Sequence, residues 1–168
     1  MPTSAWSIAP WLLVLLQTLG HPLFAAEDQP FRVGLEVRGA AVSDPARTTG
    51  WGRELQGALQ LSSGMDLEAG LQELILSNNL KYLSISGGLC WSTRDGKVAV
   101  SARGGSGRYS WNGMNGSRTW ELALSPRLRL SRPEQAWSWG ASTNFTLNKP
   151  REKTLMIFSP GVWFKLGF

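Results

Sequence analysis

The residues that most often carry acid–base or nucleophilic chemistry are scarce in this chain. Its 168 residues include one histidine, His21, and one cysteine, Cys90. A general base that works near neutral pH is most often a histidine, which activates a serine or cysteine nucleophile. Serines are plentiful, but no Gly-x-Ser-x-Gly motif surrounds any of them. A Ser–Lys pair, or a carboxylate pair such as Glu36 and Glu54, stays open, but no pattern singles one out. We therefore expect no enzymatic activity, no catalytic residue and no cofactor.

Residues that bind metals or nucleic acids are equally sparse. Zinc sites combine several cysteines and histidines, and calcium sites use clustered acidic loops, neither of which occurs here. Cys90 has no second cysteine to pair with, so we expect it to fill space inside the fold, a reactive or intermolecular thiol being the alternative. No basic groove with interleaved aromatic residues predicts a nucleic-acid partner.

The charged residues that remain alternate with apolar ones. In residues 31–42, Phe31, Val33, Leu35 and Val37 share one face, while Arg32, Glu36 and Arg38 share the other. Side chains of a strand point to opposite faces with a period of two, so this pattern predicts strands with one apolar and one polar face. The expected strands are 31–42, 51–62, 65–76, 81–91, 97–103, 119–130, 136–147 and 154–168.

The third of these segments, 65–76, is the weakest strand prediction. Its alternation would put Glu73 on the apolar face. A β-bulge near Glu73 and Leu74 would reset the alternation. The spacing of its leucines also fits an amphipathic helix, which stays open as the alternative.

The connections between these segments alternate in character. Short links are expected near 63–64, at 94–96 and at 131–135, and Asp95-Gly96 is typical of a tight hairpin turn. The other connections are 43–50, 77–80, 104–118 and 148–153. The glycine-rich segment 104–118 predicts the longest loop, in which Tyr109, Trp111 and Met114 would be exposed apolar anchors.

Eight such strands predict an all-β fold, a single antiparallel up-and-down transmembrane β-barrel. Strands of about ten residues span the hydrocarbon layer when tilted, and a barrel this small is filled by side chains. The interior charges expected from the alternation are Arg32, Glu36, Arg38, Glu54, Asp66, Glu68, Lys97, Glu121, Arg127, Arg129 and Lys165. Because buried charges need partners, Glu36 is expected to pair with Lys165 or a neighbouring arginine. This polar interior is either structural or a narrow path or small-ligand site.

The composition gives two expectations about the surroundings of the protein. The chain has nine tryptophans, which favour membrane–water interfaces. Its net charge of +5 includes basic residues in the expected outer loops. These residues would contact the phosphates of lipopolysaccharide, or form an ordinary solvated surface. They are Arg47, Arg108, Arg118, Lys149, Arg151 and Lys153.

The amino end predicts a cleaved secretory signal peptide, residues 1–25. The apolar run 11–16 is much shorter than the roughly 20 residues of a membrane-spanning helix, and small residues follow it at Ala25 and Ala26. An uncleaved anchor is the alternative. Residues 26–168 would then form one domain.

The carboxy end alternates up to its last residue. Val162, Phe164, Leu166 and Phe168 share one face, opposite Trp163 and Lys165. This tail resembles the carboxy-terminal assembly signal of bacterial outer-membrane β-barrel proteins. The resemblance implies insertion into the bacterial outer membrane by the barrel assembly machinery, with outer-membrane lipid and lipopolysaccharide as partners and an envelope protein as a further candidate.

Three functions are compatible with these expectations. The first is a structural or surface-interaction role, with contacts made by the loop 104–118. The second is a narrow channel for small solutes, and the third is a lipid-modifying enzyme. Membership of a larger export apparatus also stays open.

Overall fold

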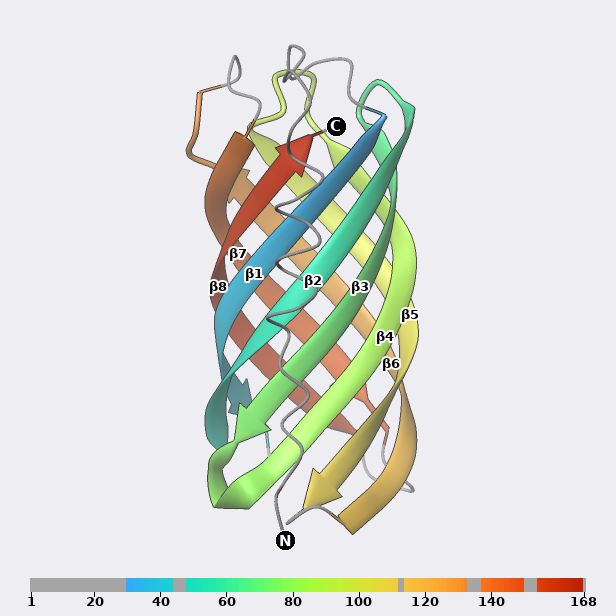
Figure 1. The fold of residues 1–168 in the computed structure, drawn as a ribbon, viewed down its shortest axis with the longest axis vertical. Helices are drawn as coiled ribbons and strands as arrows, with labels where there is room; N and C mark the ends of the chain where they lie inside the picture. The colour runs from blue at the N-terminus through green and yellow to red at the C-terminus, as the bar shows by residue number, and fades with distance from the viewer. Residues whose placement is uncertain (1–29, 44–47, 112–113, 133–136, 150–153, 168) are drawn as a thin grey trace, which may run out of the picture.

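The chain folds into a closed barrel of eight antiparallel strands (Figure 1). The computed structural model describes residues 30–43, 48–111, 114–132, 137–149 and 154–167. Each strand pairs with its neighbours in sequence, and β1 pairs with β8 to close the barrel. The strands are β1 (Phe31–Val42), β2 (Thr49–Ser62), β3 (Met65–Leu76), β4 (Leu80–Ser92), β5 (Val98–Trp111), β6 (Met114–Arg129), β7 (Trp137–Asn148) and β8 (Leu155–Gly167). The predicted fold class and number of strands are confirmed.

The two rims of the barrel differ in which strands end there. β1 begins and β8 ends at one rim, which we call the terminal rim; the opposite rim is the distal rim. Short turns join strands at the terminal rim, where Gly64 and Gly96 have positive φ. In the second turn Thr93 Oγ1 donates to Asp95 Oδ1 at 2.6 Å. This bond and one from the Lys97 amide lower the pKa of the Asp95 carboxyl. The predicted tight turn at Asp95-Gly96 is confirmed.

The period-two alternation decides which side chains enter the barrel. Along β1, Leu35 and Val37 are exposed on the outer wall, while Glu36 and Arg38 are buried inside. The other strands repeat this arrangement, and Cys90 is a buried free thiol on the inward face of β4. The polar face therefore forms the core and the apolar face forms the surface.

The segment 65–76 is a strand throughout, so the helix alternative is wrong. Its pairing with β4 runs in one register from Met65 to Leu76, and its pairing with β2 is unshifted at Glu73. The expected bulge is therefore also wrong. Glu73 stays on the outer wall because Arg53 lies directly opposite on β2 and binds it at 2.7 Å. Leu74 then points inward and is fully buried.

The expected long loop 104–118 is instead most of a hairpin. β5 runs to Trp111 and β6 starts at Met114. Glycines in this segment favour close packing rather than a loop: a Cβ at Gly107 would collide with the ring of Tyr82. Tyr109 does not anchor outside the barrel, because its ring lies 4.6 Å from that of Tyr82. Trp111 is exposed, and the Met114 side chain lies outside the described residues.

The connections described at the distal rim are short. A 3₁₀ helix, Ser77–Asn79, joins β3 to β4, and Asn79 has positive φ. No helix in the described ranges is long and apolar enough to cross a membrane.

A substitution at Gly70 tests how tightly the interior is packed. Gly70 faces inward on β3, where a Cβ would collide with Glu54 and lie 2.7 Å from Arg103. We expect Gly70→Val to destabilise the folded barrel by about 1–3 kcal/mol, the cost of overpacking a filled core. Urea unfolding of the detergent-folded protein, followed by tryptophan fluorescence, measures the change.

Gly104 provides the matched control for this substitution. It faces outward on β5, and a Cβ added there would have no heavy atom within 4 Å. Gly104→Val should leave the unfolding midpoint unchanged or raise it, since a strand glycine costs about 0.5–1 kcal/mol relative to a residue with a side chain. Equal losses in the two variants would contradict the packing described here.

Candidate functional site

The middle of the barrel interior is organised around Glu54 of β2. Arg38 of β1 and Arg103 of β5 each donate from a guanidinium to this carboxylate. All three side chains are at most 1% exposed, so water screens none of them. A single buried carboxylate therefore pairs with one guanidinium from the adjacent strand β1 and one from β5, across the barrel.

A second carboxylate, Glu36, lies beside this group. Gln56 Nε2 donates to Glu36 at 2.9 Å and to Glu54 at 3.1 Å, bridging the two acids. Ser142 Oγ donates to Glu36 at 2.7 Å, and Arg38 Nε lies 3.5 Å from it. Lys165 or a neighbouring arginine is the expected partner of Glu36. The structure places Arg38 beside Glu36, whereas Lys165 binds Glu68.

The interior nearer the terminal rim is held by two further acids. Glu68 of β3 binds Arg127 of β6 at 2.6 Å and Lys165 of β8 at 2.9 Å. Lys165 reaches across the barrel because it lies opposite Gly34, whose missing side chain leaves it room. At the rim, Asp66 binds Arg32 at 2.6 Å in a pair that water partly reaches.

Toward the distal rim the interior changes from charged to apolar. Tyr82 donates from its hydroxyl to Glu121 at 2.6 Å, and Asn148 Nδ2 donates to Tyr109 at 3.1 Å. The rings of both tyrosines take part in an apolar cluster that fills this end of the interior. It contains Ala40, Val42, Leu74, Leu76, Tyr82 and Ile157, with Leu80, Tyr109 and Leu155 packed against it. We call this group the distal cluster.

The described interior balances its charges. With Arg129 at the terminal rim left aside, it holds five basic side chains and five acidic ones. The basic residues are Arg32, Arg38, Arg103, Arg127 and Lys165, and the acidic ones are Glu36, Glu54, Asp66, Glu68 and Glu121. Balance of this kind offsets the large cost of transferring each charge out of water.

Two expected interior positions differ from the structure, and one interior residue is missing from the expected set. Lys97 is exposed in the turn before β5, and Arg129 bonds to Ser131 and the Arg132 carbonyl at the rim. Arg103 is absent from the expected interior set, although it binds the central carboxylate. The alternation of β5 continues beyond Arg103 and indicates that this residue faces inward. The small residues that follow it resemble a loop, which hides the continuation of the strand.

No metal site accompanies these carboxylates in the described ranges, where no three His, Cys, Asp or Glu side chains come together as ligands. Each interior carboxylate instead meets nitrogen or hydroxyl donors from the protein itself. The interior carboxylates are therefore neutralised by side chains of the protein itself.

The outer wall is apolar and carries aromatic residues toward both rims. Near the terminal rim are Phe31, Trp91, Trp137, Trp139 and Phe164, and toward the distal rim are Trp51, Trp120, Phe145 and Phe158. Trp137 stacks on Phe164 with ring centroids 5.9 Å apart. Aromatic girdles on either side of an apolar band are typical of barrels that sit in a bilayer.

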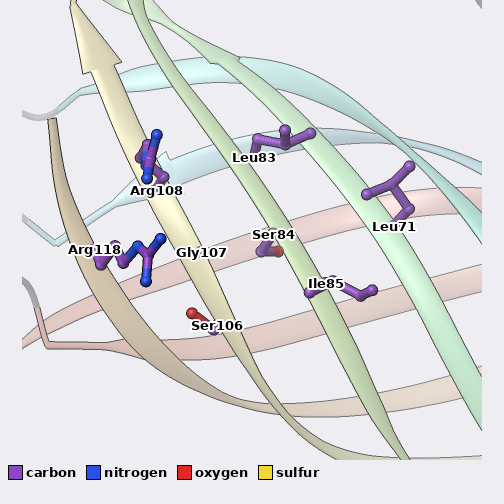
Figure 2. Close-up of a pocket in the computed structure, with 8 residues that line it drawn as sticks. All are labelled: Leu71, Leu83, Ser84, Ile85, Ser106, Gly107, Arg108 and Arg118. Atoms are coloured by element: carbon purple, nitrogen blue, oxygen red, sulfur yellow. The ribbon is translucent and has the colours of Figure 1, made fainter. Parts of the chain in front are cut away.

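A shallow pocket of about 190 Å³ opens on the outer wall over β3 to β6 (Figure 2). Its lining residues are Leu71, Leu83, Ser84, Ile85, Ser106, Gly107, Arg108 and Arg118. Arg108 of β5 and Arg118 of β6 are directly opposite each other on the same face of the hairpin. The sequence predicts a loop for both arginines, whereas the structure places them on strands.

The other residues expected to contact lipopolysaccharide or to signal assembly lie as follows. Lys149 is exposed at the distal rim, and Arg151 and Lys153 lie outside the described residues, as does Arg47. Val162 and Phe164 are exposed on the outer wall of β8 and Leu166 is half-buried. Phe168 also lies outside the described residues.

A closed barrel that is charged inside and apolar outside, with aromatic girdles at both rims, belongs to the class of transmembrane β-barrels. The ordinary soluble arrangement is the reverse, with apolar side chains in the core. Closure removes every unpaired strand edge, which hydrocarbon would not tolerate.

Comparison with solved structures places the fold within this class more narrowly. No protein-family model matches the sequence, and no curated protein matches it either. Neisserial surface protein A (NspA) is similar with a TM-score of 0.71 at 11% identity, covering 83% of this chain and 97% of that one.

Two further solved barrels share the arrangement. The amino-terminal barrel domain of Pseudomonas aeruginosa OprF has a TM-score of 0.54 at 14% identity, covering 82% of this chain and 98% of that one. The attachment invasion locus protein Ail of Yersinia pestis has a TM-score of 0.51 at 12% identity, covering 81% and 97%. At these identities the likeness shows the fold alone: this chain has the fold of the small eight-stranded outer-membrane β-barrels.

The central carboxylate gives a prediction about stability. Glu54→Gln leaves the guanidiniums of Arg38 and Arg103 without their shared counter-charge inside the barrel. We expect a loss of about 3–5 kcal/mol in the free energy of unfolding, the usual cost of breaking a buried ion pair. Equilibrium urea unfolding in lipid vesicles measures it.

Asp66→Asn serves as the control, because its pair with Arg32 lies at the rim and is partly exposed. Pairs that water reaches contribute about 1 kcal/mol or less, so this variant should change stability little. A Glu54→Gln variant as stable as Asp66→Asn would contradict the central role of Glu54.

Proposed function

We propose that the protein is an integral outer-membrane barrel with a sealed interior, which acts through its surface in a structural or interaction role. Export through a cleaved signal peptide, residues 1–25, would deliver it to the periplasm. The barrel assembly machinery would then insert it with the terminal rim facing the periplasm and the distal rim facing outward. The shared fold with small outer-membrane barrels supports this location.

The filled interior carries the proposal of a sealed barrel. Ion pairs join opposite walls through Glu54 and Glu68, so a passing solute would have to break them. The distal cluster closes the outer end, where Leu74, Tyr82 and Ile157 are fully buried. A dry apolar layer is a barrier to ions because it offers no replacement for their water. These observations favour a surface role over the alternative of a channel.

The same geometry argues against a lipid-modifying enzyme. The carboxylates that could have formed a catalytic pair, Glu36 and Glu54, are each 1% exposed and share Gln56 as a donor. A general base must come within hydrogen-bond reach of a substrate proton. Neither carboxylate faces the membrane or the solvent, so a lipid substrate would not reach them.

Contacts with partners would therefore be made at the surface. The basic residues near the distal rim, Arg108, Arg118, Lys149, Arg151 and Lys153, are the candidates for contact with lipopolysaccharide phosphates. One structure of Ail holds the heparin analogue sucrose octasulfate, a polyanion. By analogy, anionic groups outside the cell are candidate ligands here, and an envelope protein is a further candidate partner.

Planar-bilayer recording tests the sealed interior. Protein purified from the outer-membrane fraction should insert without stepwise currents, because the interior ion pairs and the distal cluster leave no continuous water path. A porin added to the same bilayer is the positive control. Reproducible unitary steps from the purified protein would overturn the sealed barrel and favour the channel.

The terminal residue gives a prediction about assembly. Phe168→Ala should lower the amount of heat-modifiable protein in the outer membrane while export to the periplasm continues, since the assembly signal would be incomplete. Phe158→Ala is the matched control, because Phe158 is an exposed phenylalanine on β8 and lies far from the terminus. Equal insertion of the two variants would show that the terminal phenylalanine is not read as a signal.

A further inference from the structure

One ion pair lies on the outer wall, among apolar side chains that face outward. Arg53 of β2 and Glu73 of β3 are directly opposite each other and bind at 2.7 Å. Val37 of β1 and Leu83 of β4 flank the pair in the same register row, and each is 54% exposed. These four strands lie side by side in the wall (Figure 1). Along β1, β2 and β3, all of them described over their full length, no other outward position holds a charged side chain.

The depth of the pair makes its exposure costly. Trp51, two positions from Arg53 on the same face and nearer the distal rim, belongs to the distal aromatic girdle. Girdle residues mark the level of the headgroups, so the pair lies just on the hydrocarbon side of that level. The side chains of Arg53 and Glu73 are still 39% and 28% exposed, so the barrel itself does not cover them. A charged group that faces hydrocarbon is costly unless further polar groups meet it.

Apolar contacts alone would not select a protein partner for this face. Lipid tails are as apolar as leucine, so proteins associate within a membrane through close packing and polar contacts. The exposed apolar side chains around the pair therefore give little preference for another protein over lipid. The ion pair does distinguish the two, because a lipid tail offers it neither a charge nor a hydrogen bond.

The pair is complementary to a second copy of itself. In a dimer with two-fold symmetry, residue i of one copy meets residue j of the other, and j meets i. If the axis passes between Arg53 and Glu73, each arginine faces the partner subunit's Glu73. Four charges of alternating sign then neutralise one another. Each carboxylate gains a second guanidinium, which is the arrangement that Glu54 has in the core.

Small residues on the same strands would let two walls approach closely. Gly57 of β2, Ala69 of β3 and Gly87 of β4 face outward in one register row, four positions from the pair along β2 and β3. The pairing is unshifted there, so no bulge explains the glycines. A Cβ at Gly57 would lie 3.9 Å from the Phe31 ring, and one at Gly87 would lie 3.6 Å from the Glu68 carbonyl, both ordinary contacts. The barrel's own packing thus does not require these glycines, and a strand glycine often marks the approach of another backbone.

We propose that the outer face of β2 and β3 joins two copies of this chain in the membrane. Arg53 and Glu73 make reciprocal ion pairs across the two-fold axis, and the row of Gly57, Ala69 and Gly87 lets the two walls pack closely. The inference rests on the proposed function, which places the barrel in a bilayer. It adds a defined interaction surface and its partner, a second copy of the same chain.

Energy transfer between labelled copies tests the dimer. Arg94→Cys, at an exposed position in a turn of the terminal rim, carries a donor or an acceptor dye, and the buried Cys90 does not compete for the dye in the folded barrel. The copies are mixed in phosphatidylcholine vesicles and diluted with lipid. Energy transfer should exceed that to an unrelated labelled barrel, and unlabelled protein should compete it away. Transfer no higher than to the unrelated barrel would overturn the dimer.

Exchanging the two charges separates an interface from a pair that only stabilises the monomer. Arg53→Glu with Glu73→Arg keeps an ion pair within each copy and leaves the net charge unchanged. This exchanged variant should pair with itself as the wild type does. It should not pair with the wild type, because like charges would meet across the axis. Since such contacts are strongly unfavourable, we expect the mixed dimer to have a dissociation constant at least about tenfold above that of either homodimer. Free mixing of the two forms would overturn the reciprocal ion pairs.

Single reversals supply the complementary result. Arg53→Glu alone makes the face acidic, and Glu73→Arg alone makes it basic. Neither variant should associate with itself, whereas a mixture of the two should restore energy transfer. A loss that mixing does not restore would contradict the proposed contacts. If a single reversal does not fold, the exchanged variant still provides the measurement, because it keeps the pair within each copy.

The ion pair at the terminal rim gives a matched control. Arg32 and Asp66 bind each other at 2.6 Å on the inward face of the wall. Arg32→Asp with Asp66→Arg exchanges charges away from the outer face, so this variant should mix with the wild type without preference. A preference as strong as that of the outer-wall exchange would mean that the assay reports altered folding, and it would overturn the interface.

Two further outcomes separate this inference from its alternatives. Native mass spectrometry that finds only monomers holding a phosphatidylethanolamine, released by both single reversals, would assign the face to a lipid headgroup and overturn the dimer. A wild-type protein that shows no heat-modifiable gel mobility and is recovered as soluble periplasmic protein would defeat the outer-membrane barrel itself. An inserted, folded barrel without specific energy transfer would defeat only the dimer.

Discussion

The barrel depends on neutralising charge in an interior that water hardly reaches. Eight strands leave a core only wide enough for side chains, so each inward charge must find its partner across the lumen. Glu54 does this for Arg38 and Arg103, and Glu68 does it for Arg127 and Lys165. Such pairs join β2 to β1 and β5, and β3 to β6 and β8. The interior ion pairs therefore favour the register of the sheet in which inward charges lie beside their partners. Apolar packing on the outer wall imposes no such condition.

Inward glycines make this crowding sterically possible. Long side chains enter a narrow core only where the residue opposite them has little volume. Lys165 passes over Gly34, the Tyr82 ring fills the space at Gly107, and the Glu54 group occupies the space at Gly70. Each of these glycines therefore leaves space that a large side chain from another strand occupies. Gly107 is one of three glycines in β5, with Gly104 and Gly105, and the distal half of this strand consequently resembles a loop when the sequence is considered alone.

The architecture is predictable from sequence because one pattern, the alternation of apolar and polar residues, both forms the strands and assigns their faces. Where that pattern is unbroken, as in β1, the structure agrees residue by residue. The structure departs from the predictions where residues distant in sequence become neighbours across strands or across the barrel. Glu73 is out of place in the alternation unless Arg53 is known to lie opposite it, and the partner of Arg103 lies 49 positions away. The arginine pair Arg108–Arg118 likewise exists only once the register of the hairpin is known.

The contrast between the two faces of the wall locates the chemistry that is left for function. Inside, with Arg129 at the terminal rim left aside, the described residues include five basic and five acidic side chains, and ion pairs join most of them. Outside, Arg53 and Glu73 form an ion pair, and Arg108 and Arg118 are cross-strand neighbours in the same row. Charged side chains are costly in hydrocarbon, so groups on the outer wall that bind partners are expected toward the headgroup level rather than in the middle of the wall.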